Sequence, residues 1–347
     1  MANMNIRKPR FYIDRVNYLL TRGIANDQFY LNSGTGLLST IMNSGTVSEL
    51  FDMRPLNQVK FNTASNSTDH ILLSADQNFG SYKTNFVAVL NHNMFSAKAR
   101  VKIASSDTEA HVQAIDMGSA TAITGVTQIL NSDGISSNVI TPDADGHTIF
   151  TFDDFTDTYI GIQFEGTNSD AFDTSGSNNL VIGCILFGEY YDMPHSPDLS
   201  VKRSIVYDKQ NIQESLGSQR FSNLPSYGKR YISATNKSPF HTYTGNGERG
   251  LYGGRINYDM KFSYLNSSDV MPSTHHIQNQ SDDTVVSDIW NYTHGSHIPF
   301  IFTQDGTSTG NNAESDYLFA RFGQNSLNMT QVAPDVFDVS MRIEEEF

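Results

Sequence analysis

The feature of this sequence that most constrains its fold is a repeated alternation of apolar and polar residues. Every second residue between positions 256 and 264 is apolar: Ile256, Tyr258, Met260, Phe262 and Tyr264. Shorter stretches at 99–103, 160–165, 298–302 and 337–343 repeat the pattern. Successive side chains of a β-strand point to opposite faces, so a period of two predicts antiparallel strands with one packed and one solvated face.

Two segments are apolar without alternation, at residues 86–90 and 180–187. Continuous runs of this length predict strands covered on both faces, as in the centre of a sandwich. The single cysteine, Cys184, lies inside the second run, so an intrachain disulfide is impossible and a role as a small buried hydrophobe is favoured.

One segment, residues 281–292, has the pattern of a helix. Ser281 or Asp282 can cap its start, acidic residues occupy the first turn, and apolar residues recur on one face. We interpret it as an ordinary helix packed across a sheet edge.

Composition agrees with many short strands joined by turns. Only 17% of the residues are charged, and Asn, Ser, Thr and Gly, which suit turns, are abundant. The predicted fold class is all-β, with two β-sandwich or jelly-roll-like domains and one short helix in the second. Pro194 and Pro197 interrupt the chain just after the second apolar run. We therefore predict an N-terminal arm at residues 1–10, a first domain at 11–192 and a second at 193–347.

The charge and the ends of the chain exclude several functions. A formal net charge of −14 argues against nucleic acid as a partner, since such proteins need a basic face. Residues 1–10 lack the apolar segment of a signal peptide, and no stretch has the roughly 20 apolar residues of a membrane span. We expect assembly in a cytosol, without membrane insertion.

Few residues suggest chemistry, and each has a plainer interpretation. The glycine-rich residues 245–250 match a dinucleotide fingerprint literally, but a strand pattern follows them instead of a helix, which favours a glycine loop. Residues 143–146 resemble the start of a calcium loop without its closing glutamate, which leaves a β-turn as the default. The stretches 275–276 and 294–297 are rich in histidine, but adjacent histidines on an extended chain point apart, which disfavours a single metal site. Asp153 and Asp154 could serve a glycosidase, but any acidic loop supplies such a pair. We therefore predict no catalytic, metal-binding or cofactor-binding residues, and no enzyme activity.

Two sets of strand and turn segments carry a resemblance to a known family. The first comprises residues 51–61, 86–93, 159–164 and 180–188, and it is similar to a discoidin-type or galactose-binding-type jelly roll. In that pattern Asp52 and Pro55 belong to an early turn, and the turn at Asn91 follows a core strand.

The second set runs from residue 194 through 203–204, 253–264, 297–302 and 319–322 to 342–345. It resembles the C-terminal half of distal-tail, tail-tip or baseplate proteins of marine and cyanobacterial bacteriophages. The resemblance implies a virion structural protein in the tail, which assembles as a symmetric oligomer with itself and with neighbouring tail proteins.

Two alternatives stay open. The first is a receptor-binding module whose jelly roll engages a host surface glycan, which aromatic residues gathered at a loop tip would favour. The second is a polysaccharide depolymerase, which requires paired carboxylates in a groove. For the closing strand, we expect its loss to prevent folding and the loss of residues 345–347 to be tolerated.

Overall fold

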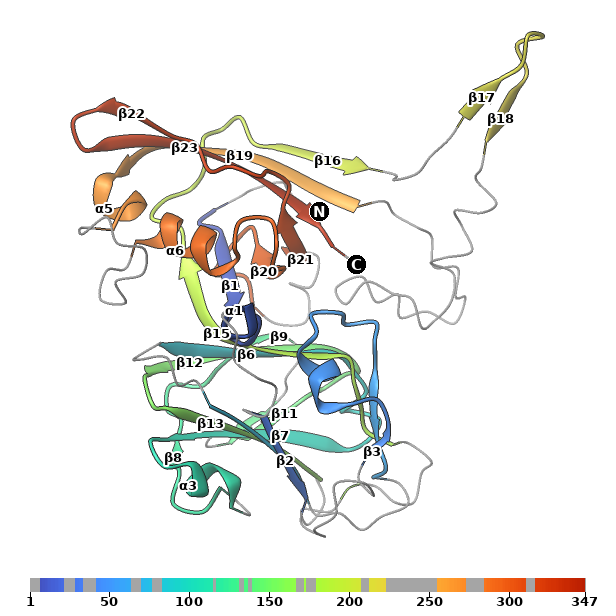
Figure 1. The fold of residues 1–347 in the computed structure, drawn as a ribbon, viewed down its shortest axis with the longest axis vertical. Helices are drawn as coiled ribbons and strands as arrows, with labels where there is room; N and C mark the ends of the chain where they lie inside the picture. The colour runs from blue at the N-terminus through green and yellow to red at the C-terminus, as the bar shows by residue number, and fades with distance from the viewer. Residues whose placement is uncertain are drawn as a thin grey trace.

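The computed structural model describes residues 7–21, 29–33, 42–63, 70–76, 83–114, 117–130, 134–136, 139–166, 172, 179–206, 212–222, 255–272, 284–309 and 316–346. The fold is all-β and sandwich-like, as predicted, and every strand pairing is antiparallel (Figure 1). The short helices are α1 (Arg15–Thr21), the 3-10 helix η2 (Val47–Phe51), α3 (Glu109–Gln113), α5 (Ser267–Val270) and α6 (Val285–Tyr292).

The largest sheet has 11 strands and runs through both halves of the molecule. In spatial order it contains β16 (Lys202–Val206), β19 (Arg255–Asn266), β23 (Val336–Glu345), β21 (Tyr317–Phe322), β20 (Phe300–Thr303), β1 (Arg10–Asp14), β15 (Cys184–Asp192), β6 (Thr84–His92), β12 (Gly146–Phe155) and β9 (Thr127–Leu130), with β22 (Met329–Ala333) paired to β23.

Three smaller sheets complete the described structure. The seven-stranded sheet contains β10 (Gly134–Ser136), β11 (Val139–Thr141), β7 (Ala99–Ser106), β13 (Tyr159–Gly166), β5 (His70–Asp76) and β2 (Phe29–Ser33), with β8 (Thr121–Ala122) paired to β7. The three-stranded sheet contains β14 (Val181–Ile182), β4 (Val59–Phe61) and β3 (Met42–Ser44), and the two-stranded sheet contains β17 (Ile212–Glu214) and β18 (Arg220–Ser222).

The first continuous apolar run lies in the central strand β6, and residues 184–187 of the second lie in the central strand β15, which confirms that both faces of these strands are covered. Residues 181–182 of the second run instead form β14 of the three-stranded sheet. Val87 and Val89 of β6 point into a sandwich core that the seven-stranded sheet closes. Phe86, Ala88 and Leu90 point into a second core, which we call the junction core because it also contains residues of β1, β19–β23 and α6. Cys184 is fully buried in this core, as predicted.

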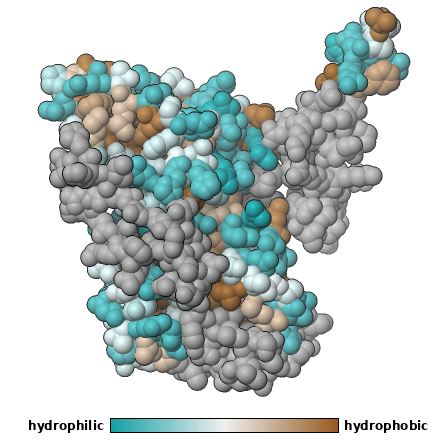
Figure 2. All heavy atoms as spheres, viewed as in Figure 1, coloured by the Kyte–Doolittle hydropathy of each residue, from teal (hydrophilic) through white to brown (hydrophobic). Residues whose placement is uncertain are grey.

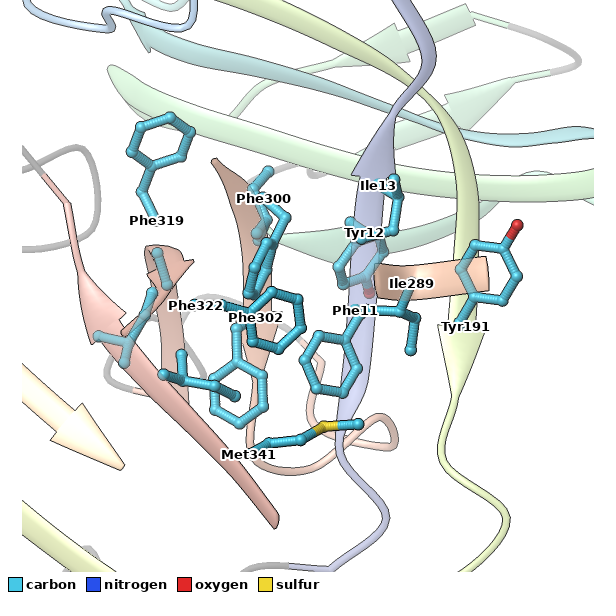
Figure 3. Packing of buried hydrophobic residues seen from close by; sticks show 14 of the residues in the cluster. Phe11, Tyr12, Ile13, Tyr191, Ile289, Phe300, Phe302, Phe319, Phe322 and Met341 are labelled. Carbon is cyan, nitrogen blue, oxygen red and sulfur yellow. The ribbon is translucent and has the colours of Figure 1, made fainter. Parts of the chain in front are cut away.

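Strand β1 lies between the two halves of the large sheet. It pairs with β15 on one side and with β20 on the other. Phe11 packs among Phe300, Phe302 and Phe322, with ring centroids 5.2–6.2 Å apart (Figure 3). One continuous sheet thus crosses residue 193, and the division of the chain at that point stays a prediction.

Residues just before β1 are also held by backbone hydrogen bonds. Met193 N donates to Pro9 O (3.0 Å), and Gly306 N donates to Lys8 O (2.9 Å). Arg10 makes a two-bond ion pair with Asp192 (2.7 and 2.9 Å). Arg10 of the predicted arm therefore belongs to the sheet and residues 8–9 are bonded to its neighbours, whereas residues 1–6 lie outside the described residues.

The predicted closing strand is β23, and its alternation is confirmed. Phe337, Val339, Met341 and Ile343 are buried, and β23 pairs with β19, β21 and β22. On β19 the alternation holds only as far as Phe262. The register with β23 then shifts, a β-bulge.

The sequence prediction that Tyr264 is buried was wrong because of this bulge. Tyr264 adopts a φ of 63° and is 78% exposed, and Leu265 takes the buried position instead. An apolar residue at the expected spacing is therefore turned outward into solvent.

Two other strands are more deeply buried than alternation predicts. On β13, Gln163 and Glu165 are buried, because Glu165 pairs with Arg100 of β7 (2.6 Å) and accepts a hydrogen bond from Gln163 (3.1 Å). All four residues of β20 are buried, including Ile301, which alternation had placed on a solvated face.

The predicted helix is confirmed as α6 at residues 285–292, and Val286 and Ile289 pack into the junction core. Its N-cap is Thr284, so the prediction of Ser281 or Asp282 was wrong. Residues 281–283 lie outside the described residues.

Candidate interaction surface

Large apolar side chains that remain exposed are concentrated in the second half of the chain. Among the described residues, seven of the eight lie after residue 193, and only Phe95 lies before it. The seven are Leu199, Ile205, Ile212, Leu216, Phe221, Tyr264 and Val332. Single exposed apolar residues are common on protein surfaces, whereas contiguous apolar patches often mark interaction surfaces.

Strands β17 and β18 form a hairpin, residues 212–222, that stands clear of the rest of the described chain (Figure 1). Its turn is closed by Ser215 N donating to Gln219 O (2.8 Å) and by Ser218 at a φ of 63°. Every residue from 212 to 221 is exposed. We call this element the projecting hairpin.

The projecting hairpin carries an apolar side chain on each face and one at its tip. Ile212 pairs with Ser222 and Gln213 pairs with Phe221, so Ile212 and Phe221 point to opposite faces. Leu216 lies at the turn, where Figure 2 shows apolar atoms at the outer end of the hairpin. An isolated two-stranded hairpin is marginally stable in water.

The segment that contains the hairpin differs in charge from the rest of the chain. Residues 201–240 hold seven of the 23 Lys and Arg residues but only two of the 37 Asp and Glu residues. The hairpin itself carries no net charge, because its one cation, Arg220, pairs with Glu214 (3.5 Å).

The bulge on β19 forms a second exposed feature around Tyr264. Asp198 accepts hydrogen bonds from Ser263 N (3.3 Å) and Ser263 Oγ (2.7 Å), which brings Leu199, itself fully exposed, beside this part of the strand. The backbone N–H of Tyr264 donates to Asp338 (3.3 Å).

Further acidic residues surround the bulge. Asp269 accepts a hydrogen bond from Asn266 N (3.0 Å), and Ser267 N donates to the backbone oxygen of Asp335 (3.0 Å). Lys261 pairs with Asp338 (2.6 Å), and the bond lowers the pKa of this aspartate, which keeps it anionic. We define the Tyr264 patch as Leu199 and Tyr264 together with the four aspartates, at 198, 269, 335 and 338.

The projecting hairpin and the Tyr264 patch lie on opposite sides of the C-terminal half. Helix α5, which directly follows the Tyr264 end of β19, is on one side in Figure 1, and β17–β18 are on the other. Each molecule therefore offers two different surfaces that face away from each other.

The motifs considered for chemistry serve local structure where they are described. Asp145 accepts hydrogen bonds from Ser96 N (2.9 Å) and from the Ser96 hydroxyl, in the turn before β12. Asp153 accepts from Thr124 Oγ1 (3.0 Å), and Asp154 accepts from Asn85 (3.0 Å).

Of the histidine and glycine motifs noted in the sequence, the structure describes only the histidines at 294–297. The His294 ring stacks on Tyr18, with centroids 5.4 Å apart. The glycine-rich residues 245–250 and the histidines at 275–276 lie outside the described residues. Within the described part of the chain, no three His, Cys, Asp or Glu side chains gather as a metal site would require. No helix in the described ranges is long and apolar enough to cross a membrane.

The turns that carried the family resemblance are tied to one another. Asp52 accepts a hydrogen bond from Arg54 N (2.8 Å), and the Asn91 side chain donates to Pro55 O (2.6 Å). The aromatic cluster that glycan binding requires is not found among the described residues of 11–192, where Phe95 is the one large apolar side chain that is exposed.

A buried cluster around Arg15 connects the two halves of the molecule. Arg15, at the start of α1, contacts Glu189 of β15 (3.3 Å), and its guanidinium lies 3.9 Å from the ring centroid of Tyr292 on α6. Tyr191 donates a hydrogen bond to Glu189 (2.8 Å). Burial raises the pKa of Glu189, and the positive charge of Arg15 opposes this rise. Because three packed elements supply these groups, we interpret the cluster as structural.

No protein-family model matches the sequence, and no curated protein matches it significantly. A structural match was found to chitosan-binding module 1 of a chitosanase/glucanase from Paenibacillus sp. IK-5, at 12% identity and a TM-score of 0.30. The match covers 47% of this chain and 96% of the module. A likeness at this level does not identify a fold or a ligand for this chain.

Sequence patterns did not predict either exposed feature. The three-residue strands of the hairpin are too short to show alternation, and Tyr264 was assigned to the buried face.

Proposed function

We propose that this chain is a self-assembling, non-enzymatic structural protein of a bacteriophage tail. The observation that carries the proposal of assembly is the projecting hairpin, whose apolar side chains on both faces and at the tip are left exposed. The tail itself is proposed from the resemblance of the sequence to distal-tail, tail-tip and baseplate proteins.

The position of the other exposed side chains supports the proposal. Leu199, Ile205, Tyr264 and Val332 belong to the same half of the molecule as the hairpin. Exposed apolar side chains become favourable when a neighbour removes them from water, at about 25 cal/mol per Å² of apolar area. A structural protein that is covered by neighbours in its working state can retain such side chains at little cost.

The first experiment measures self-association. We expect sedimentation velocity and native mass spectrometry of the purified chain to show a discrete oligomer. Phe95→Asp is the matched control for substitutions in the hairpin. The exposed fraction of Phe95 is similar to those of Ile212 and Phe221, but Phe95 lies in the other half of the molecule. A chain that stays monomeric at every concentration tested would contradict self-assembly.

The second experiment locates the protein. Antibody raised against the chain should label one position along the tail in electron micrographs of virions. Labelling of the capsid alone, or of no particle, would contradict the tail assignment while leaving self-assembly in place.

A further inference from the structure

We propose that the peptide bond between Arg220 and Phe221, in the projecting hairpin, is a cleavage site for endoproteases that cut after a basic residue, and that the cut protein stays together as one folded particle. The reaction adds water across the amide bond, which leaves a new carboxylate on Arg220 and a new amino group on Phe221. The site is independent of the proposed self-assembly and of the proposed place in a tail.

The bond is accessible because the hairpin is exposed along its length. Every residue from 212 to 221 is exposed, and so is 77% of the Arg220 side chain. The ion pair of Arg220 with Glu214 (3.5 Å) lies in solvent, where such pairs contribute little, so a protease can draw Arg220 away from it. Arg220 is the one Lys or Arg in residues 212–222, which gives a protease of this specificity a single target in the hairpin.

The hairpin is also easy to open, which cleavage requires because a protease acts on a segment that is released from its hydrogen-bonded partner. Three residue pairs join β17 to β18, and in the described sheets neither strand has a second neighbour. The turn, residues 215–218, consists mostly of small and polar residues, and exposed tips of this composition are preferred sites of proteolytic nicking. Local opening costs least in elements with few contacts, such as this one (Figure 1).

Other exposed cations in the described chain lie in backbone that is held more firmly. Lys98 is exposed in a turn, but its own N–H donates to Phe95 O (3.1 Å). The N–H of the bond after it, on Ala99, donates to Met94 O (2.8 Å), and β7 begins at this residue and pairs with β13. The exposed cations of β16, β19 and β23 are likewise in strands of the 11-stranded sheet. Cleavage after any of these residues requires part of a sheet to open.

The two products of the cut remain joined by strands that pair across it. The product 1–220 contains β1 and β16, and the product 221–347 contains β19 and β20. Strand β16 pairs with β19 and β1 pairs with β20, so each edge of the C-terminal part of the large sheet is bonded to a strand of the other product. The junction core contains side chains from both products, Phe11 among them. Separation would expose this core to water, which opposes it.

The test of the site uses trypsin on the purified full chain in native buffer, with each cleaved bond followed separately by mass spectrometry. We expect the bond after Arg220 to be cut at least about tenfold faster than the bond after Lys98. The variant Arg220→Gln should lose this product. The matched control Lys98→Gln should leave the rate at Arg220 unchanged. Both side chains are exposed, so both variants should fold as the wild type does.

The test of the cut particle uses gel filtration and circular dichroism. In native buffer the two products should elute together at the position of the uncut chain, with an unchanged spectrum. In urea they should separate, which shows that the bond was broken and that folding held the products together.

Each part of the proposal has its own contrary result. Equal cutting rates after Arg220 and Lys98, or unchanged cutting after residue 220 in Arg220→Gln, would overturn the site. Products that elute separately in native buffer would overturn the claim that the cut protein stays whole. Neither result bears on the oligomeric state of the uncut chain, so failure here is distinct from failure of the proposed self-assembly.

Discussion

The buried His92 should make the protein less stable in mild acid. This histidine lies in β6, where its Nδ1 accepts a hydrogen bond from Met94 N (3.1 Å) and its Nε2 contacts Thr148 Oγ1 (2.9 Å). Because Nδ1 accepts a bond from a backbone N–H, the ring must be neutral, with its proton on Nε2. Burial, followed by the nearby His147, lowers the pKa of His92 from 6.5 to about 3.

The size of the effect follows from linkage between proton binding and folding. The folded-state pKa is below the unfolded-state pKa, so below about pH 6.5 the unfolded chain binds a proton that the folded chain does not. Stability therefore falls as the pH drops from about 6.5 towards about 3. At pH 5 the difference is about 1.5 pH units at 1.36 kcal/mol each, or about 2 kcal/mol.

A second buried group opposes this loss. Burial raises the pKa of Asp14 from 3.8 to about 6, so the folded state takes up a proton at Asp14 between about pH 6 and pH 4 and gains stability there. Between pH 8 and pH 5 this gain is about 1 kcal/mol. The stability of the wild type therefore changes less with pH than the contribution of His92 alone. To isolate that contribution, the wild type must be compared with a variant that lacks His92.

The assay is urea unfolding at pH 8 and at pH 5 for the wild type and for His92→Asn. Asparagine keeps an oxygen acceptor near Met94 N but cannot titrate in this range. We expect the variant to be less stable at pH 8, because it loses the Thr148 contact and some packing. On acidification it should lose about 2 kcal/mol less than the wild type. Equal losses in the two proteins would refute the reasoning, since His92 would then bind protons equally in both states.

Three further perturbations test the packing, each by urea unfolding or melting temperature. Ile343→Ala should cost about 2–4 kcal/mol because the side chain is fully buried in β23, whereas Ser340→Ala, on the exposed face, should cost under about 0.5 kcal/mol. Removing the last three residues should lower the melting temperature, contrary to the expectation from sequence, because the Glu345 carboxylate is buried and accepts a hydrogen bond from a β19 amide (2.8 Å). Arg15→Met should lower the free energy of unfolding by about 3–5 kcal/mol, because Glu189 loses its cation. Adding Glu189→Leu should recover part of this stability. If the double variant is as unstable as Arg15→Met alone, the broken ion pair is not the cause.

Strand identity was predictable wherever local alternation decided it. The buried face of β23 and the doubly covered strands β6 and β15 follow from the order of apolar residues alone. Glu165 was not predictable in this way, because its burial depends on Arg100 from a neighbouring strand. Tyr264 was mispredicted because a bulge is set by the register with a partner strand, which a single segment does not contain.

The candidate site was harder to predict than the fold for a physical reason. An interaction surface consists of apolar side chains that fail to become buried, and sequence patterns assign such residues to a core. The excess of positive charge in residues 201–240 was visible in the sequence, but it does not identify the hairpin, where Arg220 pairs with Glu214.

The position of β1 between β15 and β20 has a consequence for how the chain folds during synthesis. Arg10 and its partner Asp192 are 182 residues apart in the sequence, and the other edge of β1 pairs only with residues 301–303. Contacts between such distant residues form slowly, since long loops must close first. While residue 303 is still inside the ribosome, β1 exposes an unpaired strand edge and bare aromatic rings, which favours aggregation. A fragment that ends near residue 192 would stay in that state permanently, so neither half is expected to be a good expression target without the other.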